Sequence, residues 1–402
     1  MRWDLSVLLC SVLVTLGGCG LGELVDEPDD SGVDADADID SDADIDGDAD
    51  TDGDADADGD ADVDEASDGD GSDADSGSGE GDCASLGAWS STEPFVDDGH
   101  VSHPLPSFAS GGFYYVHTLQ RGGSDDRRLY SARQSEDGSL GPWQLASDDH
   151  GGGPHGFAAI DVGGEPFHFR NGHIARYRMT ADGTMDGDVE LLEESADAAF
   201  GGNRYVWDSA VLAELPEGSR FVVHLGGFSF TGYEYHQDVF RSAVPLGSRF
   251  EDAGVDHPAS RPGRAAVVVR PGSGGALLFT GENGSDRLWR SRLGEDGSLS
   301  PFEELGGLPE GTGNERGDWF AFGATLFVIR GSSVHGADVD EGDVLGPWSP
   351  MPSLPEDQVD VTWGDGHLEG NGWGIMGGFV YVTGPTRVFY APLVAGRACA
   401  GS

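Results

Sequence analysis

The sequence predicts an all-β fold, a six-bladed β-propeller preceded by a disordered acidic linker. Short runs of β-branched and aromatic residues, separated by Gly, Asp and Pro, fill residues 83–402, and no stretch has the sustained 3.6-residue periodicity of an amphipathic helix. A unit made of two such runs and a glycine turn occurs six times. The last unit lacks its final strand, and a matching segment lies at the start of the domain, which is how a propeller closes into a ring.

The N-terminal segment has one basic residue, Arg2, followed by the apolar run Leu5–Leu16. At about 12 residues this run is shorter than the roughly 20 that a transmembrane helix needs, so it predicts a cleaved secretion signal. The run ends in Leu-Gly-Gly-Cys at Cys19, which resembles the lipobox of bacterial lipoproteins. The resemblance implies that residues 1–18 are removed and that Cys19 is acylated. An ordinary signal peptide with an incidental cysteine is the alternative.

This signal predicts an exported protein of the cell envelope, held at a membrane by its lipid. Gly20 follows the cysteine at the place where an inner-membrane retention signal usually has Asp. In a Gram-negative host we therefore expect the outer membrane, with the protein facing the periplasm or the cell surface.

Residues 19–82 form the predicted stalk. From Glu23 to Asp82 there are 28 acidic residues and no Lys or Arg. Such a segment buries too little apolar surface to fold, and its like charges extend it. Runs of Asp-x-Asp-x-Asp-Gly beginning at Asp42 and Asp54 resemble the start of calcium loops, but an EF-hand loop also needs a Glu at position 12 and flanking helices. We predict a solvated spacer without a cofactor, and weak Ca²⁺ binding by the stalk is the alternative.

The charge of the remaining chain limits its partners. After Asp82 the sequence has 44 acidic and 21 basic residues, within a total net charge of −51. Nucleic acids and anionic membranes are bound through clustered Lys and Arg, so we expect neither as a ligand of the domain.

Residues 83–402 repeat one unit, most visibly in two copies. Residues 128–133 and 287–292 begin with Arg-Leu-aromatic, and each is followed by Asp-Gly-Ser-Leu and then by an aromatic residue, Trp143 or Phe302. Weaker copies begin near residues 174, 239 and 334. The turn glycines of these units are Gly138, Gly183, Gly247, Gly297 and Gly342.

The sixth copy decides the architecture. It covers residues 379–392 and ends without an outer strand, which Ala84–Trp89 supplies from the other end of the domain. Six copies predict six blades, and a seventh stays open because the third unit is long enough for extra strands. Cys83 precedes the borrowed strand and Cys399 follows the unit that it completes. We therefore expect a disulfide between them, which an exported protein permits.

The order of strand, Gly-Gly, aromatic strand, glycine turn and Trp resembles the kelch and galactose-oxidase-like propeller repeat of many exported bacterial lipoproteins. The resemblance covers residues 83–402, although the second unit has Val189 near the place of the Trp. It implies that an aromatic residue on the outer strand packs between neighbouring blades. Galactose oxidase requires copper and a cysteine-linked tyrosine, and both cysteines of this domain are used at the closure. The aromatic residues that we expect to pack between neighbouring blades are Trp89, Trp143, Phe302 and Trp348.

No motif of a catalytic or metal centre is present. The chain lacks Gly-x-Ser-x-Gly, His-Glu-x-x-His and Cys-x-x-Cys. Residues 135–143 resemble the Asp-box of sialidases, but Ser139 and Pro142 replace its Gly and Trp. We predict no catalytic residues and no metal ligands. The strand arginines Arg128, Arg241 and Arg287 are expected to pair with local carboxylates, the alternative being a sialidase-like triad.

The predicted function is ligand binding at one face of the propeller. Several aromatic and polar residues of the connecting segments are not required by the repeat, and they suit the faces of sugars or a protein partner. We expect a monomeric, non-catalytic binding or scaffold module for a glycan or a protein, rather than an enzyme. An exported glycan-processing hydrolase or lyase on the same fold is the alternative, as is a structural subunit of an envelope complex. The candidate ligand-binding residues are Trp207, Tyr233, Tyr235, His236, Trp319, Trp363 and Trp373.

Overall fold

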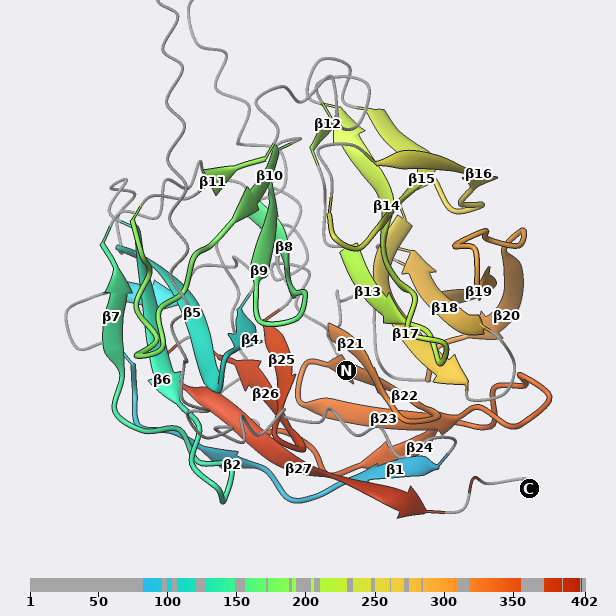
Figure 1. Ribbon diagram of the computed structural model, residues 1–402. Helices are drawn as coiled ribbons and strands as arrows, with labels where there is room; N and C mark the ends of the chain where they lie inside the picture. The colour runs from blue at the N-terminus through green and yellow to red at the C-terminus, as the bar shows by residue number, and fades with distance from the viewer. Residues whose placement is uncertain are drawn as a thin grey trace, which may run out of the picture. The chain divides into compact units, whose positions relative to one another are not determined.

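Antiparallel β-sheets make up all regular structure in the part of the chain that this computed structural model describes (Figure 1). These residues form six sheets, each with a path of four strands. We call the sheets blades 1 to 6. The described residues are 82–95, 100–102, 107–120, 127–148, 156–170, 173–187, 190–192, 204–205, 210–229, 234–246, 250–260, 262–270, 275–282, 285–309, 318–355, 372–384, 386–397 and 399.

Blades 1 to 3 follow one another along the chain. Blade 1 contains β3 (His100–Ser102), β4 (Phe108–Ser110), β5 (Phe113–Gln120), β6 (Arg127–Arg133) and β7 (Gln144–Ser147). Blade 2 contains β8 (Gly156–Asp161), β9 (Pro166–Arg170), β10 (His173–Arg176) and β11 (Glu190–Leu191). Blade 3 contains β12 (Arg204–Tyr205), β13 (Ala210–Glu214), β14 (Arg220–Ser229), β15 (Glu234–Ala243) and β16 (Glu251–Asp256).

Blades 4 and 5 repeat the pattern, and blade 6 joins the two ends of the domain. Blade 4 contains β17 (Pro262–Arg270), β18 (Gly275–Glu282), β19 (Arg287–Gly294) and β20 (Glu303–Gly307). Blade 5 contains β21 (Asp318–Phe322), β22 (Thr325–Arg330), β23 (Ser333–Asp338) and β24 (Ser349–Met351). Blade 6 contains β25 (Trp373–Met376), β26 (Phe379–Thr383), β27 (Val388–Arg397), β1 (Cys83–Leu86) and β2 (Ser90–Ser91).

The six blades surround a common centre, as predicted. First strands of successive blades contact one another, in the order β25, β4, β8, β13, β17 and β21 (Figure 1). The extra length of the third unit does not make another blade in the described residues. Both β12 and β13 pair with the ten-residue strand β14, so the added residues lengthen blade 3. The prediction of a six-bladed propeller is confirmed.

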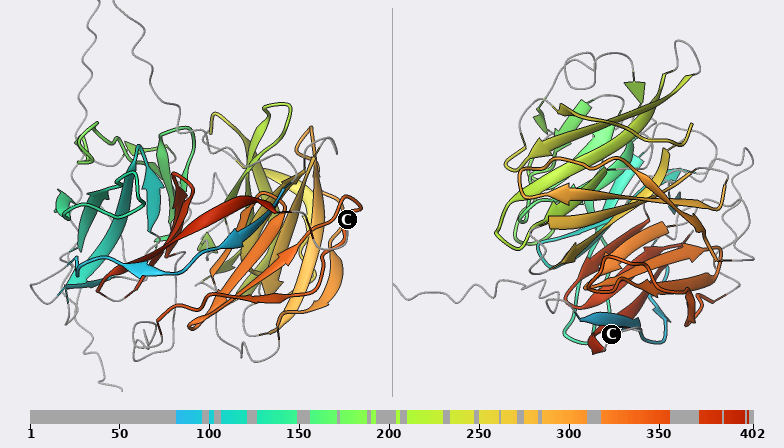
Figure 2. Two further views of the ribbon diagram at one scale, coloured as in Figure 1. Left: turned by 90° about the horizontal axis from the view of Figure 1, so that it is seen from below. Right: turned by 90° about the vertical axis from the view of Figure 1, so that its right-hand side faces the viewer.

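The ring closes where the sequence predicted. β1 pairs antiparallel with β27, with Cys83 opposite Arg397 and Leu86 opposite Leu393, so the N-terminal strand is the outer strand of the C-terminal blade. Figure 2 shows this strand, in blue, beside β27, in red. A disulfide joins Cys83 to Cys399 across a sequence separation of 316, with 5.0 Å between the Cα atoms.

An ion pair supports the closure beside the disulfide. The Arg397 guanidinium donates to both carboxylate oxygens of Asp338 in blade 5, at 2.8 and 2.6 Å, and to the carbonyl of Ala84 at 3.0 Å. Asp338 is buried, and its Oδ1 also accepts from the Thr325 hydroxyl. Bidentate Arg–carboxylate pairs are strong and directional, so this contact fixes β1 and β27 against blade 5.

A tight turn connects the third and fourth strands of blades 1, 2, 4 and 5. Gly138, Gly183 and Gly297 have φ of 80°, 82° and 76° there. The same hydrogen-bond pattern places Asp343, with φ of 64°, at this position in blade 5. Gly342, which the sequence pattern assigned to the turn, therefore lies one residue before it.

Each of these turn glycines is covered by a phenylalanine of the preceding blade. A Cβ atom at Gly138, Gly183 or Gly297 would lie within 2.5 Å of the ring of Phe379, Phe113 or Phe221, respectively. A side chain at the glycine would therefore displace the ring. The blades are joined by close packing of an aromatic ring on a backbone that has no side chain.

The repeat aromatics also pack between blades. Trp89 donates its indole N–H to the carbonyl of Pro352 in blade 5 at 2.7 Å. Phe302 packs with buried residues of blades 3 and 4, Trp348 with those of blades 4 and 5, and Trp143 with those of blades 6 and 1. Each ring thus fills space between its own blade and the preceding one.

We expect Gly297→Ala to lower the free energy of unfolding by about 3 kcal/mol, because it adds a strained positive φ and a clash with Phe221. Gly218 is a matched control, since its φ is 91° and no atom lies within 4 Å of its added Cβ. Gly218→Ala should cost about 1 kcal/mol, for backbone strain alone. Urea unfolding of both variants measures the difference, and equal losses would contradict the ring-on-glycine contact.

Candidate functional site

The antiparallel order of every blade defines two faces of the propeller. First strands begin and second strands end on one face, as the pairings Pro262 with Glu282 and Trp373 with Val382 illustrate. We call this the loop face. The opposite turn face carries the short turns between first and second strands and those between third and fourth strands. The chain reaches β1 at the turn face, where the Asp82 carbonyl accepts from the Ala324 N–H at 3.1 Å.

The candidate ligand-binding residues that the structure describes lie at the loop-face end of their strands. Trp207, Tyr233 and Trp363 lie outside the described residues. Tyr235 and His236 lie near the start of β15 in blade 3. Trp319 is in β21 of blade 5, and Trp373 begins β25 of blade 6. The described members therefore share a face but come from three different blades, and they do not form one cluster.

Trp319 is a core residue. Its side chain is only 2% exposed and packs with residues of blades 4 and 5. A Cβ atom at Gly281 of blade 4 would lie 2.9 Å from the Trp319 ring, so the glycine makes room for the indole. Trp319 thus joins two blades and has almost no surface for a ligand. Trp373 is partly buried, with its ring 5.6 Å from that of Phe320.

Buried histidines are a feature that the sequence did not reveal. His117, His168, His224 and His257 are each at most 1% exposed. The His257 imidazole accepts from the Ala259 N–H at 3.1 Å through Nδ1, so Nε2 carries the proton that it shares with the Thr280 hydroxyl at 2.7 Å. Burial lowers the pKa of His257 to about 4 and that of His224 to about 3. Both imidazoles are therefore neutral at physiological pH.

Two of these histidines meet between blades 1 and 2. The rings of His117 and His168 stack with centroids 5.5 Å apart, and the Tyr177 hydroxyl lies 2.8 Å from Nδ1 of His168. Phe108 stacks on Tyr115 and Tyr177 in the same layer. The group is an aromatic packing layer with an internal hydrogen bond. Its signal in the sequence was a histidine that follows apolar strand residues, a pattern also seen at His224.

The strand arginines are engaged with the scaffold. All 22 basic residues of the chain are arginine. Arg287 donates to both oxygens of Glu304 at 3.0 and 2.7 Å and lies over the Trp289 ring. Arg241 donates to the carbonyl of Asp296 in the next blade at 3.2 Å. Arg128 donates to the Tyr130 hydroxyl at 3.4 Å. These three arginines lie on the third strands of three blades and do not converge.

The carboxyl group of Asp161 is partly buried between blades 1 and 2. Asp161 ends β8 and accepts from the Gly164 N–H at 2.7 Å through Oδ1. Burial raises the pKa of its carboxyl, against the opposing effect of hydrogen bonds from Ser110 and Gly164. The group caps the turn of its own blade at the turn face, on the side of the molecule away from the candidate ligand residues.

The described residues contain neither a cluster of metal-binding side chains nor a helix that could span a membrane. Among them, no three His, Cys, Asp or Glu side chains lie close enough together to hold a metal ion. They also include no helix that could span a membrane.

Comparisons with known proteins find solved structures of similar fold, and they identify no family for this chain. No protein-family model matches the chain, and no curated protein sequence does. Regucalcin from Agrobacterium tumefaciens, described as a calcium-binding protein, is 12% identical with a TM-score of 0.45, over 77% of this chain and 98% of that one. A luciferin-regenerating enzyme is 11% identical with a TM-score of 0.42, over 80% and 98%. A Hadza microbial sialidase is 11% identical with a TM-score of 0.43, over 73% and 65%.

Proposed function

We propose that this protein is a lipid-anchored envelope protein whose propeller binds a ligand at its loop face without transforming it. The observation that carries the proposal is the use of the charged and titratable side chains in the described blades. Arg397 with Asp338, Arg287 with Glu304, and His257 with Thr280 all hold strands or blades together. The charged side chains of the blades thus stabilise the fold, and we assign ligand recognition to the connections at the loop face.

The ligand that suits this domain is a neutral glycan. The domain carries far more acidic than basic residues, which disfavours anionic polymers. Trp207 and Trp363 are aromatic residues that the repeat does not require, and the proposal assigns to them the flat apolar surfaces that sugar rings stack on. The lipid at Cys19 and the acidic stalk would hold the propeller at a distance from the membrane.

We expect the purified full-length protein to be retained by at least one neutral polysaccharide on an array, with no new fragments by mass spectrometry. Trp207→Ala and Trp363→Ala should each weaken retention about tenfold, as the loss of a central aromatic contact does. Leu145→Ala is the matched control, because Leu145 is 45% exposed on the outer strand β7, and it should leave retention unchanged.

The other outcomes of this experiment distinguish the rival functions. New oligosaccharide fragments would overturn the proposal in favour of a hydrolase or lyase. Absence of both retention and cleavage would remove the glycan and direct the search to a protein partner. Equal weakening by Leu145→Ala would show that retention does not occur at the loop face.

A further inference from the structure

The junction between blades 4 and 5 departs from the ring-on-glycine contact that joins blades 6 and 1, blades 1 and 2, and blades 3 and 4. Asp343 replaces the turn glycine there and keeps a positive φ of 64°. Leu277 replaces the covering phenylalanine, since it pairs with Arg292 in blade 4 as Phe113 pairs with Arg133 in blade 1. Non-glycine residues at positive φ are strained and persist only where the surroundings hold them.

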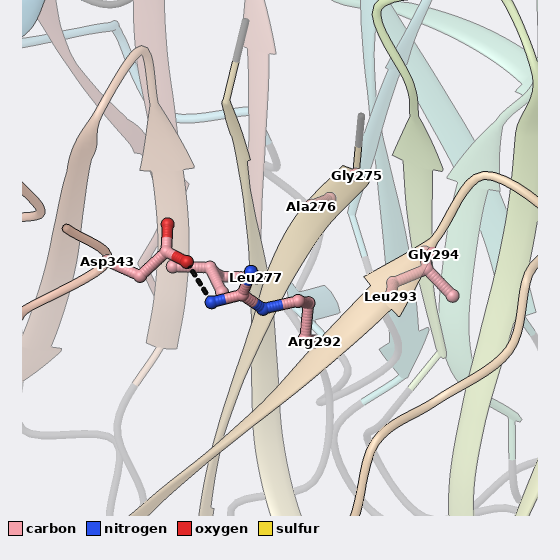
Figure 3. A pocket seen from close by; sticks show the side chains of 7 residues that line it. All are labelled: Gly275, Ala276, Leu277, Arg292, Leu293, Gly294 and Asp343. Carbon is pink, nitrogen blue, oxygen red and sulfur yellow. Dashed lines mark hydrogen bonds and ion pairs between the residues drawn. The ribbon is translucent and has the colours of Figure 1, made fainter. Parts of the chain in front are cut away.

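Ionic contacts hold this junction in place of an aromatic ring. Arg292 of blade 4 forms an ion pair with the Asp343 carboxylate (Figure 3), and Arg290 donates to the Asp343 carbonyl. At the matching place in blade 1, the Arg133 guanidinium lies over the Phe113 ring at 5.7 Å. The equivalent arginine therefore changes its partner from an aromatic ring to a carboxylate.

The substitution leaves space between the blades. A cavity of about 40 Å³ lies at the junction, lined by Leu277, Arg292, Asp343 and neighbouring residues of β18 and β19 (Figure 3). Such a volume admits one or two water molecules. The Arg292 side chain is 60% exposed and that of Asp343 is 11% exposed. Salt ions therefore reach the Arg292 guanidinium, and the more buried Asp343 carboxylate relies on this guanidinium to balance its charge.

We propose that the blade 4–blade 5 junction is an ion-controlled latch, which loosens at high ionic strength while the ring-on-glycine junctions stay closed. Salt shortens the range of electrostatic attraction from about 10 Å at 0.1 M to about 3 Å at 1 M. Screening weakens the hold of Arg292 on Asp343, the strained turn of residues 339–346 separates from blade 4, and water enters through the existing cavity. Aromatic packing has no such dependence on salt.

Amide hydrogen exchange of the purified full-length protein tests the latch. At 1 M NaCl, relative to 0.05 M, we expect residues 339–346 to exchange about three- to fivefold faster, which is the range of an exposed ion pair. The control is residues 134–141 of blade 1, where Phe379 covers Gly138, and their rate should change less than twofold. An equal salt response in both turns, or none in either, would overturn the proposal.

Two variants make the test specific. Leu277→Phe combined with Asp343→Gly restores the ring-on-glycine contact and should abolish the salt response of residues 339–346. Arg292→Gln removes the ion pair and should give fast exchange at both salt concentrations, so it decides the matter even where the double variant folds poorly. A salt response that persists in Arg292→Gln would show that the ion pair is not the latch.

Discussion

Replacing Cys83 and Cys399 by Ser is expected to lower the free energy of unfolding by roughly 5 kcal/mol. The disulfide closes a loop of 316 residues, and the entropy that such a cross-link removes from the unfolded chain grows with the logarithm of loop length. In its absence the hydrogen bonds of β1 to β27 and the contact of Arg397 with Asp338 remain, so the ring should still close. The double variant should therefore have native spectra but a much lower denaturation midpoint than the parent protein.

Urea unfolding of the double variant Cys83→Ser with Cys399→Ser measures this loss. Ser85→Ala, in the same outer strand, is the control for a serine-sized change at the closure, and it should alter stability by less than about 1 kcal/mol. A double variant as stable as the parent would mean that β1 is held by its pairing alone.

Acid is expected to destabilise the protein well before its carboxylates titrate. Well above pH 6.5, His224 and His257 are neutral in both the folded and unfolded states and contribute no pH dependence. Below it, the unfolded chain binds protons that the buried imidazoles cannot, because burial holds their pKa values at about 3 and about 4. The free energy of unfolding should therefore fall with falling pH, by about 3 kcal/mol for each histidine at pH 4.

The slope of stability against pH between 6.5 and 5 isolates the histidines. There we expect these two histidines to make the unfolded state bind about one more proton than the folded state at pH 6.5 and about two more at pH 5, and His224→Leu should remove about half of this difference. The carboxyl of Asp161 acts in the opposite direction, since burial raises its pKa and it binds its proton more readily when folded. An unchanged slope in His224→Leu would show that this imidazole is accessible to protons in the folded protein.

The sequence predicted the ring and its closure because these features repeat. Six copies of one unit reveal a missing strand by comparison, and the cysteines mark its two ends. The position of Asp343 was not predictable in the same way, because aspartate also tolerates the left-handed backbone, and the neighbouring Gly342 offered a better match to the pattern. Only the hydrogen bonds of the turn show that Asp343, and not Gly342, occupies the position of the turn glycine.

The candidate site was less predictable than the fold for a physical reason. An aromatic residue outside the repeat pattern can be buried or exposed, and which one applies depends on a partner far away in the sequence. Trp319 is buried because Gly281 leaves room for it in the preceding blade. His224 appears polar in a one-dimensional pattern, yet it lies in the core beside Phe240 and Phe250.

The place where the chain reaches the propeller also determines how the domain carries mechanical load. In the proposed tethered state, tension from the membrane arrives at Asp82 and passes into β1. The Cys83–Cys399 bond ties β1 to the end of β27, so the load enters blade 6 through two strands and β1 cannot be peeled away alone. Drag on a bound ligand would then be resisted at the ring closure by a covalent bond as well as by the hydrogen bonds between β1 and β27.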